Sequence, residues 1–313
     1  MIERAMSWLT DDERSTYGVA VTRIMIGFVV SSQLLLNWPD RSYTWGSGSR
    51  WNETVADVKG FPGFFGLFRA LDGWQWDVAY LLVVISGIAL MVGVFTRVTT
   101  VTTVILWTSV YVANPYVGSG GDAMLRMVLF YLCFTNAGKV WSVDAWLQDR
   151  RGPRPRMAPP WVSATLHNLA VILMIHQVVM VYVGSALWKV QSPVWRDGTA
   201  VYYPLQTEAY SPWNDLLQPV FANALFISGA TWTAVVVQLF FPVLLIYRPT
   251  RMVALVIITG MHLGIGFLMG IMYFSLAMIA VDMMLVSDKT WRFASELVQR
   301  QWSRRFPAKV RAH

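Results

Sequence analysis

A single lysine closes a long apolar run in the middle of the chain. The stretch from 181 to 203 reads VYVGSALWKVQSPVWRDGTAVYY, and Lys189 stands in it after an apolar segment that begins at Ser163. A lysine at the edge of a membrane normally extends its ammonium group to the lipid headgroups. An amine that is shielded from water and has no acidic partner can instead work as a general base. Both interpretations are open at this point.

Aromatic side chains accompany this lysine in the same stretch. They are Tyr182, Trp188, Trp195 and Tyr202. Rings of this size exclude water from a neighbouring amine, and their polar edges can bind the polar part of a ligand. We therefore expect these four residues to line a substrate cavity beside Lys189.

A second pair of ionisable residues stands at the start of another apolar run. Asp122 and Arg126 are four residues apart, which places them on one face of a helix, where they can pair. They follow GSGG, a flexible segment that lets the backbone approach a ligand. We expect Asp122 to share in catalysis with Lys189, and Arg126 to orient or polarise the substrate.

Further ionisable side chains lie inside apolar runs, where they are costly and usually paired. His176 and His262 are expected at similar depth, as hydrogen-bonded packing residues that can also contact a polar ligand head. A metal site would need three or four ligands, and no HExxH pattern is present, so no metal site is predicted. Arg23 and Asp282 are expected to form an ion pair between the first and last spans.

The composition identifies the environment that must hold these residues. Of 313 residues, 55% are hydrophobic and 14% are charged, whereas a soluble domain carries about 25% charged residues. This favours a polytopic helical membrane protein. One cysteine excludes a disulfide within the chain and a cysteine-based zinc site. The net charge of +7 comes from basic residues in short loops between apolar runs and in the C-terminal tail, so nucleic acid is not an expected partner.

The apolar runs predict an all-α bundle of about eight membrane spans. They cover 17–38, 77–95, 98–113, 123–138, 162–187, 222–247, 252–269 and 271–286. An even number of spans puts most of the Lys and Arg residues on the side of both termini, which predicts that both termini are cytoplasmic. We expect a multi-pass protein of the cytoplasmic membrane, with a segment 1–16, a membrane domain 17–286 and a basic tail 287–313. The tail is expected as a surface helix or as a frayed, solvated end.

Two long outer loops complete the predicted organisation. They cover 39–76 and 188–221 and are rich in Trp, Phe and Gly, and loops of this length are often functional. We expect them to cover a cavity that opens toward the outer leaflet between the fourth and fifth spans.

Four stretches resemble one membrane family in their order along the chain. They are TRIMIGFVV, then GGDAMLRMVLFYLCF leading into VWSVDAWL, then VYVGSALWKVQSPVWRDGTAVYY, and finally MHLGIGFLMGIMYFSLAMIA. Together they cover about 15–286 and resemble the HTTM (horizontally transferred transmembrane) family, which includes the membrane domain of vitamin K-dependent gamma-carboxylase. The resemblance implies that Lys189 is the base that deprotonates a reduced quinone, which makes a reduced quinone the implied cofactor.

The sequence also departs from the carboxylase pattern. Asp122 stands where the carboxylase has a histidine, and an aspartate does not exchange protons over the same pH range. The carboxylase carries a large luminal portion that recognises its peptide substrate, whereas 287–313 follows the last expected span here. Bacterial relatives take part in peptide maturation together with small partner proteins. We therefore expect the partners to be the lipid bilayer and either a small membrane or extracytoplasmic protein or a peptide substrate.

Three functions remain open from the sequence. The first is an enzyme or enzyme-like subunit that acts on a lipid-soluble or peptide substrate beside Lys189. The second is a non-catalytic partner that helps another protein to mature or to be exported, for which loss of the lysine would be silent. A small-molecule transporter is the third, but no internal repeat of the kind typical of transporters is seen.

Overall fold

The chain folds into a bundle of helices in a computed structural model that describes residues 2–48, 63–152 and 158–305. No strand occurs in these three ranges. The α-helices are α1 Ile2–Thr10, α2 Thr16–Leu36, α3 Arg41–Thr44, α4 Leu67–Ala70, α5 Gly73–Val92, α6 Thr96–Ala113, α7 Gly120–Leu132, α8 Val143–Arg151, α9 Pro160–Gln191, α10 Pro193–Arg196, α11 Tyr202–Gln206, α12 Asn214–Phe221, α13 Ala224–Leu244, α14 Arg248–Leu268, α15 Met272–Asp282 and α16 Asp288–Arg305. Four short 3₁₀ helices, η1 to η4, cover Gly63–Gly66, Pro115–Val117, Glu208–Tyr210 and Met283–Leu285.

Each of the eight predicted apolar runs contains a helix. Among the described residues, five helices are long and apolar enough to cross a membrane, namely α2, α5, α9, α13 and α14. The other three, α6, α7 and α15, are shorter or less apolar. The two long loops that the sequence predicts on the outer side are partly helical: α10, α11 and α12 occupy the second, and residues 49–62 of the first lie outside the described ranges.

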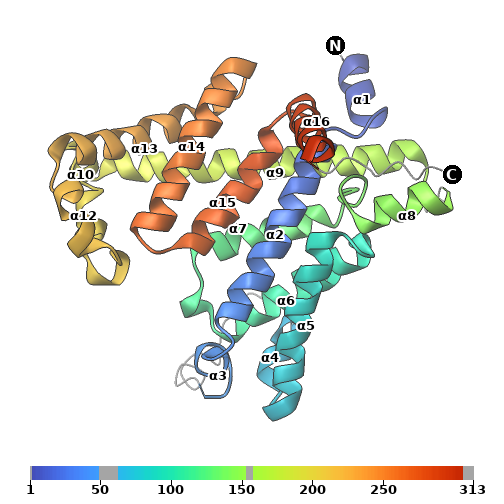
Figure 1. The fold of residues 1–313 in the computed structure, drawn as a ribbon, viewed down its shortest axis with the longest axis horizontal. Coiled ribbons are helices and arrows are strands. Elements are labelled where there is room, and N and C mark those ends of the chain that lie inside the picture. Colours follow the sequence, from blue (N-terminus) through green and yellow to red (C-terminus); the bar gives the residue numbers. More distant parts are fainter. Residues whose placement is uncertain (1, 49–62, 153–157, 306–313) are drawn as a thin grey trace.

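The helices run back and forth between two ends of the bundle (Figure 1). At one end the chain before α2 meets the first part of α9, and the first turn of α2 meets the start of α16, through hydrogen bonds of Arg14 N to Asn168 and of Tyr17 N to Asp288. At the other end Arg41 binds Asp77 at 2.8 Å, and Trp213 donates to the Phe267 carbonyl at 2.9 Å. We call these the terminal end and the loop end. The helix α9 extends across the whole bundle and contacts α1, α7, α13 and α15.

Local residue choices explain where the helices begin and end. Ser119 caps α7 in a capping box with Asp122, which satisfies free N–H groups of the first turn. Helix α5 ends at Gly93, whose φ of 72° favours glycine. Helix α9 starts with Pro160 in its first turn and ends just before Pro193, as expected from the absence of an N–H on proline.

Arg23 does not form the predicted ion pair with Asp282. Its guanidinium is fully buried and donates to four backbone carbonyl oxygens instead, those of Ala137 (3.0 Å), Leu90 (2.5 Å), Met91 (2.8 Å) and Trp141 (2.6 Å). These carbonyls belong to the end of α5 and to the turn between α7 and α8. Carbonyls at helix ends and turns lack helical donors. The arginine therefore joins α2 to two chain reversals at the terminal end.

Helices α2 and α5 approach each other closely because two glycines face across the contact. A Cβ on Gly27 would lie 2.5 Å from the Met91 nitrogen and 2.6 Å from the Gly87 oxygen. Small residues allow this kind of close packing between membrane helices.

We expect Gly27→Ala to lower the free energy of unfolding by about 1–3 kcal/mol, because backbone atoms must move to admit the methyl group. Gly229→Ala is the matched control, since a Cβ on Gly229 in α13 meets nothing within 4 Å. Equilibrium unfolding in mixed micelles measures both. Equal stability of the two variants would contradict the close contact.

Glu13 links three segments at the terminal end. Its carboxylate lies 2.8 Å from Lys139 Nζ and accepts hydrogen bonds from Asn136 and Ser163. Burial alone would raise the pKa of Glu13, but the hydrogen bond and charge of Lys139 and the hydrogen bond of Asn136 outweigh it, so the pKa is lowered. A carboxyl group with a lowered folded-state pKa stabilises the protein above its unfolded-state pKa of about 4.3.

We therefore expect Glu13→Gln to be less stable than the parent protein at pH 7. The difference should shrink as the pH falls below about 4.3 and vanish below the folded-state pKa, because the parent carboxyl is then protonated too. Unfolding curves at several pH values test this, with the exposed Glu3→Gln as control. A difference that is constant with pH would rule out the ionic contribution.

Candidate functional site

Lys189 lies in the last turn of α9 and faces α13. Its Nζ donates to Gln238 Oε1 at 2.5 Å and lies 4.9 Å from the centre of the Trp195 ring. In the part of the chain that the structure describes, no carboxylate lies within ion-pair distance of this amine. Its partners are thus an amide oxygen and an aromatic face, and neither carries a negative charge.

Gln238 was not among the residues predicted from the sequence. It is an amide within the apolar helix α13 and is 5% exposed. Its Nε2 faces Met261 Sδ at 3.7 Å. Pro242 follows one turn later in the same helix. A lone amide inside a membrane helix is a functional signal, but the search for ionisable groups alone does not detect it.

Tyr182 lies two turns before Lys189 and joins two other spans. Its hydroxyl is 3.1 Å from His262 Nε2 on α14 and donates to Asp282 Oδ2 on α15 at 2.6 Å. The exposed fractions of the three residues are 1%, 2% and 0%. The structure therefore brings together two predicted site residues, Tyr182 and His262, with Asp282 as a partner that the sequence had assigned to Arg23.

Asp122 and Arg126 lie elsewhere, on the first turns of α7. The Asp122 carboxylate accepts from the Ser119 nitrogen at 2.6 Å and from its hydroxyl at 2.8 Å, as part of the helix cap. The Arg126 guanidinium stacks 3.5 Å from the centre of the Tyr111 ring, and its Nε donates to the Asp122 backbone carbonyl at 3.4 Å. The predicted contact between this pair thus involves the backbone carbonyl of Asp122.

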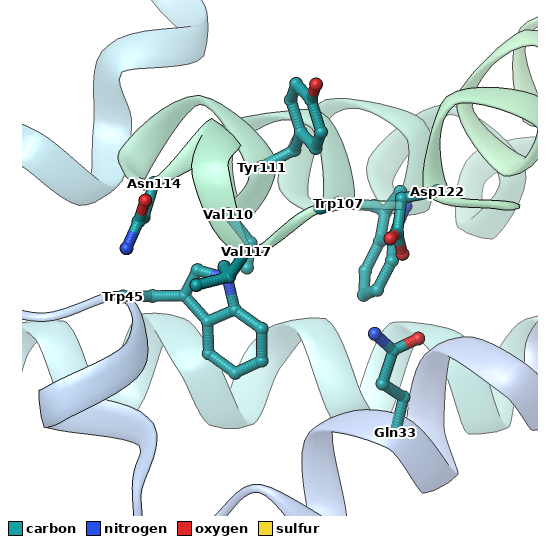
Figure 2. Close-up of a pocket in the computed structure, with 9 residues that line it drawn as sticks. Gln33, Trp45, Trp107, Val110, Tyr111, Asn114, Val117 and Asp122 are labelled. Carbon is teal, nitrogen blue, oxygen red and sulfur yellow. The ribbon is translucent and has the colours of Figure 1, made fainter. Parts of the chain in front are cut away.

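A small pocket lies beside Asp122 at the loop end (Figure 2). Gln33 and Trp45 approach it from one side and Trp107 and Asp122 from the other. Its cavity volume of about 10 Å³ has room for about one water molecule. This pocket lies between α2, α6 and the turn into α7, whereas the predicted cavity lay between α7 and α9.

The remaining predicted residues are more exposed. Trp188 is 76% exposed, Tyr202 is 43% exposed, and His176 is exposed on the outer surface of α9. Trp195 is half-buried over Lys189. His176 and His262 do not lie on a common surface, and no group of three metal-ligating residues occurs in the described ranges.

The geometry provides an amine with neutral partners, flanked by an aromatic ring, next to a buried Tyr–His–Asp hydrogen-bond chain. Groups of this kind accept and pass on protons. Together with five described helices that are long and apolar enough to span a bilayer, they define a polytopic membrane protein with hydrogen-bonded ionisable groups in its interior.

The sequence model of the HTTM domain family matches residues 13–291, which is nearly the whole chain. The protein therefore belongs to the HTTM family. No solved structure matches the chain.

Proposed function

We propose that this protein is a carboxylase-like membrane enzyme, or a subunit of one, in which Lys189 is the base. The observation that carries the proposal is the set of partners of the amine: an amide oxygen at 2.5 Å, an aromatic ring and no carboxylate in the described ranges. A neutral amine can take a proton from an acidic hydroxyl group, and a reduced quinone dissolved in the bilayer offers such a group. Membership of the HTTM family supports the same chemistry.

The roles of the surrounding residues follow from their contacts. Gln238 holds the amine in place through its amide oxygen, and Trp195 offers a face on which a flat ring can stack beside Nζ. Asp122 caps the start of α7 and lines the small pocket there, and Arg126 stacks on Tyr111, which lines the same pocket. Tyr202, Trp188 and His176 are assigned to contacts with the substrate's apolar portion or with lipid, because their side chains are exposed.

We propose eight membrane spans with the terminal end in the cytoplasm. The back-and-forth course of α2, α5, α6, α7, α9, α13, α14 and α15 between the two ends supports this number. The domain would then cover 17–286, with 1–16 and 287–313 on the cytoplasmic side of the cell membrane. Helix α9 has 32 residues and a length of about 48 Å. It exceeds the ~30 Å of hydrocarbon, so its last turn, with Lys189, would reach the outer leaflet.

An oxygen-uptake assay tests the proposed function. The full-length protein in lipid nanodiscs receives a reduced naphthoquinone with a short isoprenoid tail. We expect oxygen consumption above that of empty nanodiscs, since deprotonation of the hydroquinone speeds its oxidation by oxygen. A rate equal to that of empty nanodiscs would contradict the enzymatic proposal.

The second candidate function is a non-catalytic partner for a peptide or a small protein. It is favoured by exposed apolar side chains on and beside the short helices between α9 and α13. Leu216 is 74% exposed, Leu225 is 86% exposed and Trp188 is 76% exposed. Such residues either contact lipid or mark an interaction surface. Loss of co-purification of a partner after loop substitutions, with no effect of substituting Lys189, would favour this function over the first.

A further inference from the structure

The hydrogen-bonded chain of Tyr182, His262 and Asp282 ends on each side at a polar atom without a hydrogen-bond partner. Tyr182 is hydrogen-bonded to both other residues, at 3.1 Å and 2.6 Å. His262 Nδ1 and Asp282 Oδ1 are buried and have no hydrogen-bond partner in the described structure. Buried polar atoms without partners are uncommon in native proteins.

The number of protons on the chain fixes its hydrogen-bond directions. Tyr182 has a single hydroxyl proton, and with Asp282 ionised this proton must point to the carboxylate. The tyrosine oxygen then accepts, so His262 must donate through Nε2–H. In this arrangement His262 Nδ1 carries no proton and is a free acceptor.

We propose that these three residues form a proton relay that stores one proton on Asp282. When an incoming proton binds to His262 Nδ1, the Nε2–H bond breaks. The proton released from Nε2 moves to the Tyr182 oxygen. The original hydroxyl proton of Tyr182 moves to Asp282 Oδ2. The three residues of the relay then hold one more proton, and their total charge changes from −1 to 0. His262 is neutral, with its proton on Nδ1.

Aromatic rings pack against the relay. Phe241 and Phe274 pack against Tyr182 and His262, with ring centres 4.8 Å and 5.8 Å apart, so water is largely excluded. The Ser275 hydroxyl on α15 is buried and has no hydrogen-bond partner in the described ranges. It faces Gly266, one turn from His262 on α14, where an added Cβ would lie 3.2 Å from the Ser275 oxygen.

Charged side chains on two of the helices that pack against α15 are directed to other partners. Arg23, on α2, directs its guanidinium to backbone carbonyls. Lys189, on α9, directs its amine to Gln238. Neither supplies a fixed counter-charge to Asp282 by direct contact, so the gain and loss of a proton is the way in which this buried carboxyl group is neutralised.

The relay goes beyond the proposed function and does not depend on it. It needs no quinone and no basic role for Lys189. If the proposed function holds, the relay provides a second acceptor for protons released inside the membrane domain.

The decisive observation is the position of the proton on His262. We would label the ring nitrogens of histidine with ¹⁵N in the full-length protein in nanodiscs and record NMR spectra over a range of pH. The protein has four histidines, and the signals that disappear in His262→Gln are those of His262. We expect His262 to stay neutral and to move its proton from Nε2 to Nδ1 as the pH is lowered. The infrared band of a protonated carboxylic acid, absent in Asp282→Asn, should appear over the same pH range.

Tyr182→Phe removes the link between the two ends and should abolish the coupled change. Tyr80→Phe is the matched control, because Tyr80 is equally buried and donates only to the Leu34 carbonyl, at 2.9 Å. The coupled change should persist in this control. The proposal is overturned if His262 keeps one neutral tautomer throughout, if it becomes a charged imidazolium, or if Tyr182→Phe leaves the coupled change intact.

Discussion

Replacing Lys189 with alanine is expected to slow the oxidation of an added hydroquinone by roughly 100- to 10,000-fold, the usual contribution of a general base. The amine is the basic group at this position, and its partner Gln238 is an amide that cannot take over its role. The variant should be produced at normal abundance, since the lost contacts are one hydrogen bond and one cation–ring contact. The measurement is oxygen uptake in nanodiscs, normalised to protein.

Two further variants separate a base from a fixed charge. Lys189→Arg keeps the positive charge, but its guanidinium stays protonated at all ordinary pH values. It should be as slow as the alanine variant if Lys189 is a base, and active if only its charge matters. Lys289→Ala, an exposed lysine on α16, is the matched control and should keep the full rate. A full rate in Lys189→Ala at normal abundance would remove the base from the mechanism.

The second large effect is expected at Arg23. Arg23→Met keeps an unbranched side chain of similar length but removes every donor, which leaves four carbonyl oxygens at the terminal end without this partner. An unsatisfied buried polar group costs about 1–3 kcal/mol. We therefore expect a loss of about 4 kcal/mol or more in the free energy of unfolding, at the upper end of single-substitution effects. Equilibrium unfolding in mixed micelles measures it.

Arg300→Met provides the comparison for this loss. Arg300 lies on α16, its side chain is 73% exposed, and it lies 4.0 Å from Glu296. A surface substitution of this kind changes stability by less than about 0.5 kcal/mol. If Arg23→Met were no more destabilising than Arg300→Met, the buried guanidinium would not be the structural connection described above.

The helices of this protein could be predicted from its sequence because a membrane helix has a strong and simple signal. An uninterrupted apolar run must form a helix in order to satisfy its backbone groups. All eight runs accordingly contain helices. The helix ends were less predictable: α9 continues to Gln191 and not to 187, because Pro193 and not Lys189 marks its end.

The partners of the polar residues could not be predicted in the same way. Sequence spacing shows which residues share a helix face, but it does not show which other helix covers that face. Opposite charges at similar depth suggest an ion pair between Arg23 and Asp282. In the structure Arg23 donates hydrogen bonds to carbonyls at chain reversals, and Asp282 accepts one from Tyr182. The spacing of Asp122 and Arg126 predicts a reactive carboxylate, whereas the Asp122 carboxylate takes part in a helix cap, which the pattern Ser119-Gly-Gly-Asp122 already allowed.

Pro242 weakens the backbone of helix α13 at Gln238, the residue whose amide binds Lys189. A proline has no N–H group, so the backbone carbonyl four residues earlier, that of Gln238, lacks its helical donor. Helix α13 can therefore bend at the residue that holds the lysine amine more easily than elsewhere along its length. A molecule that displaces Gln238 from Lys189 can be accommodated by a hinge movement of α13, with the rest of the bundle left in place.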